Sequence, residues 1–166
     1  MKTILITGSN GGIGQGLCKS FTENGWRVIG IDLEEKSKGN TSTYLTIDLD
    51  RLCEDETYTD QVIKNILCEC QEGLDLLVNN AATQNLDSVE GLTFKNWQTT
   101  LNVNLNSVFI LIKSLLPKLK KKRGNVVNIA SIHATLTKPN FSAYATSKAA
   151  LVGLTKSLAV ELGSKV

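Results

Sequence analysis

Short apolar runs alternate with longer amphipathic stretches along this chain. The apolar runs are nearly continuous, which is typical of strands buried on both faces of a parallel sheet. They lie at residues 3–7, 27–32, 43–48, 74–80 and 125–131. The amphipathic stretches predict helices at residues 12–24, 58–71, 93–122 and 141–162. This alternation predicts an α/β fold with a doubly wound parallel sheet, Rossmann-like, in one domain over residues 1–166.

One connection between the predicted strands is unusually short. Eleven residues, "LEEKSKGNTST", separate Asp32 from Tyr44. A crossover between parallel strands normally needs a dozen residues or more and contains a helix. We therefore expect at most one helical turn here.

The composition and net charge of the chain exclude few classes of protein. Of the 166 residues, 42% are apolar and 20% are charged, as in ordinary soluble proteins. The net charge of +2 argues neither for nor against nucleic acid, and the basic run at 118–124 is typical of a solvated helix end. We expect no nucleic-acid partner. No apolar run approaches the ~20 residues of a membrane helix or forms a secretory signal, so we also expect no membrane partner and a cytoplasmic location.

The cysteines do not suggest a metal site. They show no C-x-x-C spacing, and the chain has a single histidine. Small buried hydrophobic side chains are the favoured interpretation of Cys18, Cys53, Cys68 and Cys70.

The stretch "TGSNGGIG", residues 7–14, follows a predicted strand and opens a predicted helix. That context distinguishes a phosphate-binding loop from a flexible linker, because backbone N–H groups at a helix start receive phosphates. Gly8, Gly12 and Gly14 form a T-G-x-x-x-G-x-G pattern rather than the usual G-x-G-x-x-G. A purely structural turn is the alternative.

Asp32 ends the second predicted strand, eighteen residues after Gly14. A carboxylate there can accept hydrogen bonds from an adenosine ribose, and it would repel a 2′-phosphate. The glycine-rich loop contains no Arg or Lys. We therefore expect NAD rather than NADP, with a solvated strand-end Asp as the alternative.

Tyr144 and Lys148 lie four residues apart in "YATSK", on one face of the last predicted helix. An ammonium about 4 Å from a phenolate stabilises it by about 4 kcal/mol at an effective dielectric of 20, enough to make a tyrosine useful as a base. Such a pair is also common by chance on a helix surface. Ser131, thirteen residues before Tyr144, ends the fifth predicted strand, where open α/β sheets bind ligands.

Together these residues resemble the short-chain dehydrogenases/reductases. The motifs are "TGSNGGIG", Asp32, "DL" at 48–49, "NNAA" at 79–82, "VNLNSVF" at 103–109, Ser131, "YATSK" and "ALVGLTKSLAVEL". They run from residue 3 to residue 162 in the family's order. The resemblance implies the sheet order 3-2-1-4-5 and an NAD-dependent oxidoreductase acting on a small secondary alcohol or ketone.

The resemblance also implies a role for each matching residue. Tyr144 would be the general acid/base, Lys148 would stabilise the phenolate and hold the nicotinamide ribose, and Ser131 would bind the reacting oxygen. Asn104 would support a water relay to the lysine. The residues implied around NAD are Gly8, Ser9, Asn10, Gly12, Ile13, Gly14, Asp32, Asp48, Leu49, Asn80, Ala81, Tyr144 and Lys148.

The family continues after this helix with two further strands and a substrate lid, whereas this chain ends at "ELGSKV". We therefore expect five strands and an incomplete C-terminus. A catalytically silent or truncated NAD-binding module is the alternative function.

Two further expectations concern partners and a histidine. In the family, helices equivalent to 93–122 and 141–162 pair across a two-fold axis, which implies a homo-oligomer, either a dimer or a tetramer. His133 lies two residues after Ser131. It is either a contact for a polar or acidic substrate at the pocket mouth or a loop histidine that bridges elements.

Overall fold

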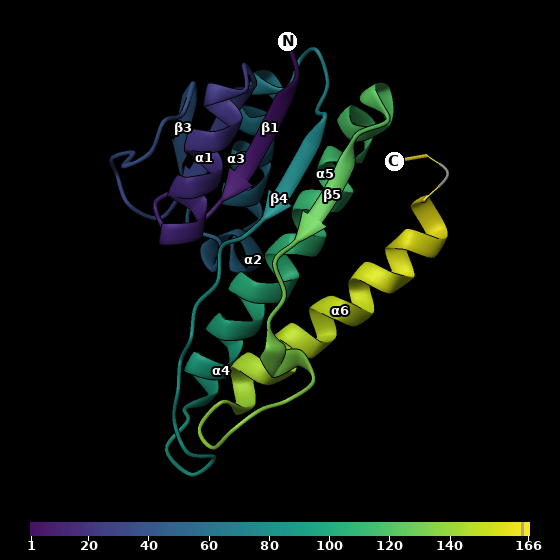
Figure 1. Ribbon diagram of the computed structural model, residues 1–166. Helices are drawn as coiled ribbons and strands as arrows, with labels where there is room; N and C mark the ends of the chain where they lie inside the picture. The colour runs from purple at the N-terminus through teal and green to yellow at the C-terminus, as the bar shows by residue number, and fades with distance from the viewer. Residues whose placement is uncertain (164) are drawn as a thin grey trace.

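Five parallel strands form one sheet in the computed structural model, which describes residues 1–163 and 165–166. The strand order is β3-β2-β1-β4-β5 (Figure 1). The strands are β1 (Thr3–Thr7), β2 (Arg27–Asp32), β3 (Thr43–Thr46), β4 (Leu76–Asn79) and β5 (Asn125–Asn128). The predicted fold class and strand order are confirmed.

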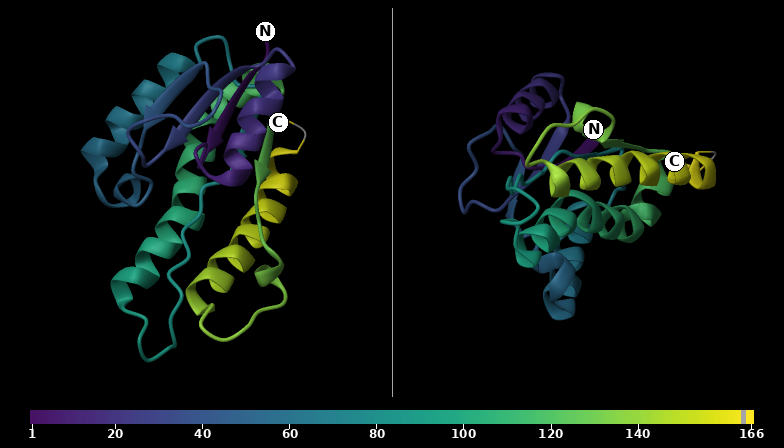
Figure 2. Two further views of the ribbon diagram at one scale, coloured as in Figure 1. Left: turned by 60° about the vertical axis from the view of Figure 1, so that its left-hand side comes forward. Right: turned by 90° about the horizontal axis from the view of Figure 1, so that it is seen from below.

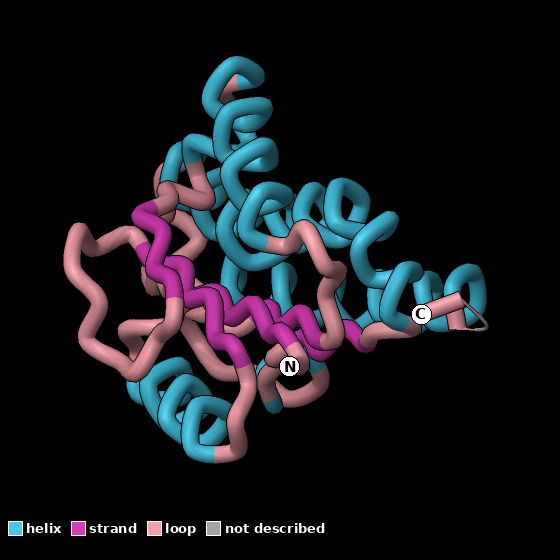
Figure 3. The backbone as a smooth tube through the Cα atoms, turned by 90° about the horizontal axis from the view of Figure 1, so that it is seen from above, coloured by secondary structure: helices cyan, strands magenta, loops and turns pink. Residues whose placement is uncertain are grey.

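Helices cover both faces of the sheet (Figure 3). They are α1 (Gly12–Glu23), α2 (Arg51–Glu54), α3 (Glu56–Glu69), α4 (Phe94–Leu101), α5 (Ser107–Lys122) and α6 (Ser142–Leu162). The alternating side chains of β1 show the two faces: Ile4 and Ile6 pack with Cys18 of α1, whereas Leu5 packs toward α3 and α5. The sheet is therefore buried on both sides, as its apolar strands predict.

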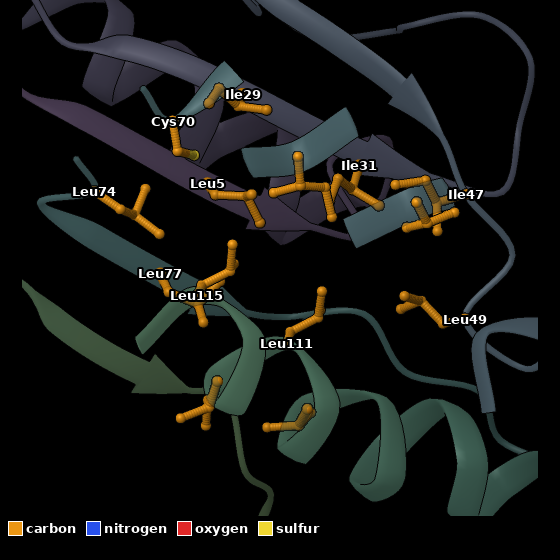
Figure 4. Close-up of a cluster of buried hydrophobic side chains, with 14 of the residues drawn as sticks. Leu5, Ile29, Ile31, Ile47, Leu49, Cys70, Leu74, Leu77, Leu111 and Leu115 are labelled. Carbon is orange, nitrogen blue, oxygen red and sulfur yellow. The ribbon is translucent and has the colours of Figure 1, made fainter. Parts of the chain in front are cut away.

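The larger core lies between the sheet and α5 (Figure 4). Leu111, Leu115 and Leu119 recur every four residues and are fully buried, so they form one face of the helix. The helical stretch from Phe94 to Lys122 is 29 residues long and meets a length and hydropathy criterion for a membrane span, with 44% of its most apolar window buried. Packing on the sheet accounts for these apolar leucines.

The helix predicted over 93–122 is divided in the structure. Between α4 and α5, residues Asn102–Asn106 form a π-helical segment, η1. A π-helical turn inserts an extra residue and is frequent at functional sites. It contains Asn104, one of the predicted site residues.

Three strands end earlier than predicted: β3 at Thr46 rather than 48, β4 at Asn79 rather than 80, and β5 at Asn128 rather than 131. β3 ends at Thr46, and Asp48 Oδ1 accepts the N–H groups of Asp50 and Arg51 at the start of α2, at 2.9 and 3.2 Å. β5 ends at Asn128, so Ser131 lies three residues beyond the strand rather than at its end. Such local bonds compete with strand pairing.

The connections before α4 and before α6 extend past the carboxyl ends of β4 and β5 (Figures 1 and 2). They touch one another where the Asp87 N–H donates to the Asn140 carbonyl at 3.1 Å. Residues 33–42, between β2 and β3, contain no helix, as the short spacing predicts. These three loops follow the carboxyl ends of the strands, where the predicted site residues gather.

Candidate active site

The glycine-rich loop needs glycine at two of its positions. Gly8 has φ +66°, and a Cβ there would lie 2.8 Å from Ala81 Cα. A Cβ on Gly14 would overlap the carbonyl oxygen of Gly8. Gly12 has open space where its Cβ would be, so it leaves the loop accessible from outside. At these glycine positions the loop presents backbone without a side chain, which suits a close-lying phosphate.

Thr7 and Asn80 hold this loop against the end of β4. Thr7 Oγ1 accepts the N–H groups of Asn80 and Ala81, both at 3.0 Å. The Asn80 side-chain amide donates to the carbonyl oxygens of Thr7 and Gly8, also at 3.0 Å. Four hydrogen bonds therefore fix the loop relative to the neighbouring strand.

A cavity of about 710 Å³ lies beside the loop. This volume is within the range of pockets that bind small molecules and cofactors. Nine predicted cofactor residues line it, namely Gly8, Asn10, Gly12, Ile13, Asp32, Asp48, Leu49, Asn80 and Ala81. The remaining four predicted cofactor residues, Ser9, Gly14, Tyr144 and Lys148, are not among its lining residues.

Ser9 lies under the loop rather than at the cavity wall. It is fully buried, its N–H donates to the Ile31 carbonyl at 3.1 Å, and a Cβ on Gly30 would lie 2.9 Å from its Oγ. Within the described part of the chain, Ser9 Oγ has no hydrogen-bond partner. Its side chain therefore faces β2.

Asp32 is held at the cavity wall by two backbone groups. Its Oδ2 accepts the Asn10 N–H at 2.9 Å, and its Oδ1 accepts the Leu33 N–H at 2.8 Å. The carboxylate is thus oriented before any ligand binds, with lone pairs left for further donors.

Tyr144 and Lys148 lie in the first two turns of α6 and are nearly buried, with 7% and 2% of their surface exposed. The Lys148 ammonium donates to the Ile129 carbonyl at 2.7 Å and lies 5.8 Å from the centroid of the Tyr144 ring. Burial lowers the pKa of Lys148 from 10.5 to about 8. The Lys148 ammonium is therefore buried close to the Tyr144 ring, and part of Lys148 is unprotonated near its lowered pKa.

Asn104 connects the β4–α4 loop to α6. Its Oδ1 accepts the Thr83 N–H at 2.8 Å, and its Nδ2 donates to Thr83 O and to Ser147 Oγ, both at 3.0 Å. Ser147 Oγ in turn donates to the Tyr144 carbonyl at 2.7 Å. Because Thr83 also lines the cavity, this chain of bonds positions α6 relative to it.

Ser131 and His133 form the turn that precedes α6. Ser131 is half-buried, and its Oγ accepts the His133 N–H at 3.2 Å at the start of the 3-10 turn η2 (Ile132–Ala134). The His133 ring stacks on Phe141 at 4.2 Å and meets the Tyr144 ring edge-on at 6.0 Å. Its Nδ1 is buried without a partner among the described residues. His133 therefore bridges η2 and α6.

Sequence reasoning did not identify Thr7, Thr83 or Ser147. Each acts through a hydrogen bond to another site residue. Ser147 could have been found, because it lies three residues after Tyr144 and one before Lys148 on the same helix. Thr83 contributes only backbone groups to Asn104, so no residue type could reveal it.

Cys18 and Cys70 are buried and Cys53 is partly buried, whereas Cys68 is exposed, so the prediction of a small buried side chain is wrong for Cys68. Burial raises the pKa of Cys53 to about 12 and that of Cys70 to about 11, which keeps both thiols protonated. Across residues 1–163 and 165–166, no group of three or more His, Cys, Asp or Glu side chains is placed to hold a metal ion.

A parallel sheet with a glycine-rich loop at its first strand defines a Rossmann-like nucleotide-binding fold. The family model described as short chain dehydrogenase matches residues 2–166. This chain therefore belongs to the short chain dehydrogenase family. The matched model spans nearly the whole chain, and its membership of this family is thereby shown.

The chain is similar to several named proteins. It is 37% identical over 172 residues to the 2-dehydro-3-deoxy-D-gluconate 5-dehydrogenase of Bacillus subtilis, covering 96% of this chain and 65% of that protein. A 4-hydroxyisoleucine dehydrogenase solved with NADH shares 29% identity and a TM-score of 0.85, covering 99% of this chain and 69% of that one. A putative NAD(P)-dependent gluconate 5-dehydrogenase from Beutenbergia cavernae, solved with NADP at low occupancy, shares 28% identity and a TM-score of 0.86, covering 99% and 68%. The chain spans about two thirds of the length of these proteins.

The lowered pKa of Lys148 predicts a pH-dependent stability. Between pH 8 and 10.5 the unfolded chain binds this proton and the folded chain does not, so stability rises with pH. Relative to Lys148→Met, the native sequence should gain up to about 3 kcal/mol of unfolding free energy across this window. Urea unfolding at several pH values measures the gain.

The control is Lys113→Met, which removes an exposed lysine of α5. It should follow the native pH dependence. If Lys148→Met also follows it, Lys148 does not titrate as described.

Proposed function

We propose that this protein transfers a hydride between NAD(H) and a small secondary alcohol or ketone, with Tyr144 as general acid/base. The observation that carries the proposal is the buried Tyr144–Lys148 pair at the start of α6. Asn104 links this helix to Thr83, a residue that lines the cavity. The names of similar proteins support the substrate class, since 4-hydroxyisoleucine carries an alcohol.

In this proposal the chain handles the proton. The nicotinamide supplies the hydride acceptor or donor when bound. The Tyr144 hydroxyl would exchange a proton with the substrate oxygen, and the Lys148 ammonium would stabilise the phenolate. Ser131 Oγ would hydrogen-bond the reacting oxygen. Asn104 would hold α6 in place and support a water relay to Lys148.

The geometry of the loop fits a dinucleotide. The glycine surface at Gly8 and Gly14 has no room for side chains, and Gly12 leaves it open. Asp32 stands at the cavity wall with its carboxylate already oriented. The residues proposed to contact the cofactor are Gly8, Asn10, Gly12, Ile13, Asp32, Asp48, Leu49, Asn80 and Ala81, with Tyr144 and Lys148 at the nicotinamide ribose and Ser9 and Gly14 beneath the pyrophosphate.

NAD is the proposed cofactor, because Asp32 would repel a phosphate on the adenosine ribose. NAD⁺ should bind at least about tenfold more tightly than NADP⁺, a difference of about 1.4 kcal/mol. Asp32→Ala combined with Leu33→Arg should narrow or reverse the difference. Calorimetric titration of both cofactors measures it.

Asp60→Ala, on the exposed face of α3, is the matched control and should keep the native preference. Equal dissociation constants for NAD⁺ and NADP⁺ in the unmodified chain would contradict the assignment.

Tyr144→Phe tests the proposed catalysis. Losing the hydroxyl should lower kcat with small secondary alcohols and NAD⁺ by about 10²- to 10⁴-fold, the usual contribution of a general acid/base. The dissociation constant for NADH should change little, because the ring remains. Lys148→Ala should lower kcat and also weaken NADH binding, since Lys148 is proposed to serve both proton transfer and ribose binding. If Tyr144→Phe retains most of its kcat, the mechanism is wrong.

A catalytically silent cofactor-binding module is the second candidate. Tyr144 and Lys148 do not line the cavity that nine of the proposed cofactor residues line, which favours this candidate. Cofactor binding without turnover on any secondary alcohol or ketone would support this candidate over the enzyme.

We also propose a homo-oligomer, a dimer or a tetramer, formed through the helices α4–α5 and α6. Phe109 on α5 and Val160 on α6 are 47% and 91% exposed, although both are large and apolar. Light scattering should give a particle mass two or four times that of one chain, and Phe109→Glu should lower this mass. Val89→Glu, in an exposed loop, should leave it unchanged. A strict monomer at high concentration would contradict the proposal.

A further inference from the structure

Asn10 contacts both carboxylates at one end of the cavity. Its backbone N–H donates to Asp32 Oδ2 at 2.9 Å, and its side-chain Nδ2 donates to Glu34 Oε2 at 3.2 Å. Asp32 and Glu34 both line the cavity. Asn10 is only 7% exposed, and its side-chain amide donates to groups of the protein.

The same side chain holds the helix-free connection between β2 and β3. Asn10 Nδ2 also donates to the Lys36 carbonyl at 2.9 Å and to the Tyr44 hydroxyl at 3.0 Å. Its Oδ1 accepts the Lys38 N–H at 2.8 Å. Both amide hydrogens are used, shared among three acceptors, and Oδ1 uses one of its two acceptor positions. An aspartate could not replace it, since a carboxylate has no donor.

Glu34 compensates the nearest loop cation. The Lys38 ammonium donates to Glu34 Oε1 at 2.7 Å and to no other described side chain. This hydrogen bond holds the pKa of Glu34 below its ordinary range, so the carboxylate is charged at neutral pH. Glu34 thus places a negative charge at the cavity wall and forms an ion pair with the Lys38 ammonium.

We propose that Asn10 is a positioning residue for cofactor choice. It holds Glu34 at the cavity wall beside Asp32, so that two carboxylates, rather than Asp32 alone, reject a phosphate on the adenosine ribose. The inference rests on the proposed function, because it concerns the same cofactor site. It adds a second discriminating carboxylate and the residue that orients it.

The test compares Asn10→Ala with Asn40→Ala. Asn40 is exposed in the same connection, and its side chain makes no hydrogen bond to any described residue. Titration of NAD⁺ and NADP⁺ at one fixed salt concentration gives the ratio of their dissociation constants. Asn10→Ala should reduce the preference for NAD⁺ by about threefold to fivefold, the size expected for partly exposed charges. Asn40→Ala should leave the ratio unchanged.

A residue with a merely structural role would weaken both cofactors equally and leave the ratio unchanged, which would overturn the inference. Glu34→Gln should reduce the ratio by a similar factor. Asn10→Ala combined with Glu34→Gln should reduce the ratio no further, because once residue 34 is neutral Asn10 holds no charge at the cavity wall. Full additivity of the two effects would contradict the link between them.

Hydrogen exchange tests the same contact without a cofactor. The Lys38 amide should exchange faster in Asn10→Ala than in the native chain or in Asn40→Ala, because its acceptor is lost. Unchanged exchange of the Lys38 amide would overturn the inference. If the unmodified chain binds neither cofactor, the proposed function fails and the inference fails with it. If NAD⁺ binds and the ratio does not respond to Asn10→Ala, only the inference fails.

Discussion

The close approach of two strand ends is the constraint on which the site depends. Gly8 follows β1, and a Cβ on it would lie 2.8 Å from Ala81 Cα after β4. Because that Cβ is missing, the Asn80 amide reaches the Gly8 carbonyl at 3.0 Å. The segment after β4 then continues to Thr83, which Asn104 binds through both backbone groups. The absence of one side chain thus sets how the phosphate loop lies relative to the proposed catalytic helix.

The sequence predicted most of the fold because strand burial leaves a strong signal. Continuous apolar runs located every strand, and the family motifs implied their order. The ends of β3 and β5 were predicted too late. Asp48 and Ser131 bind nearby N–H groups, and this local competition with the sheet is not visible in hydrophobic periodicity. The π-helical turn at Asn104 was also missed, because residues 93–122 were predicted as one continuous helix.

The predicted site residues gather near the carboxyl ends of the strands, but the sequence did not show in which direction their side chains point. Motif spacing put Ser9 and Asn10 in the phosphate loop. Their side chains instead point toward β2 and the β2–β3 connection. Side-chain direction in a glycine-rich loop depends on backbone angles that residue types do not report. The ligand contacts of these residues stay predictions, and their packing roles come from the structure.

Several of the bonds that organise the site end on main-chain atoms. Asn104 binds the N–H and carbonyl of residue 83, and Lys148 binds the carbonyl of residue 129. Main-chain groups are present whatever side chain a position carries. Positions 83 and 129 can therefore change during evolution without disconnecting the frame. Such a site separates the parts that must be inherited unchanged from the surroundings that selection can vary, so one framework can be adapted to many substrates.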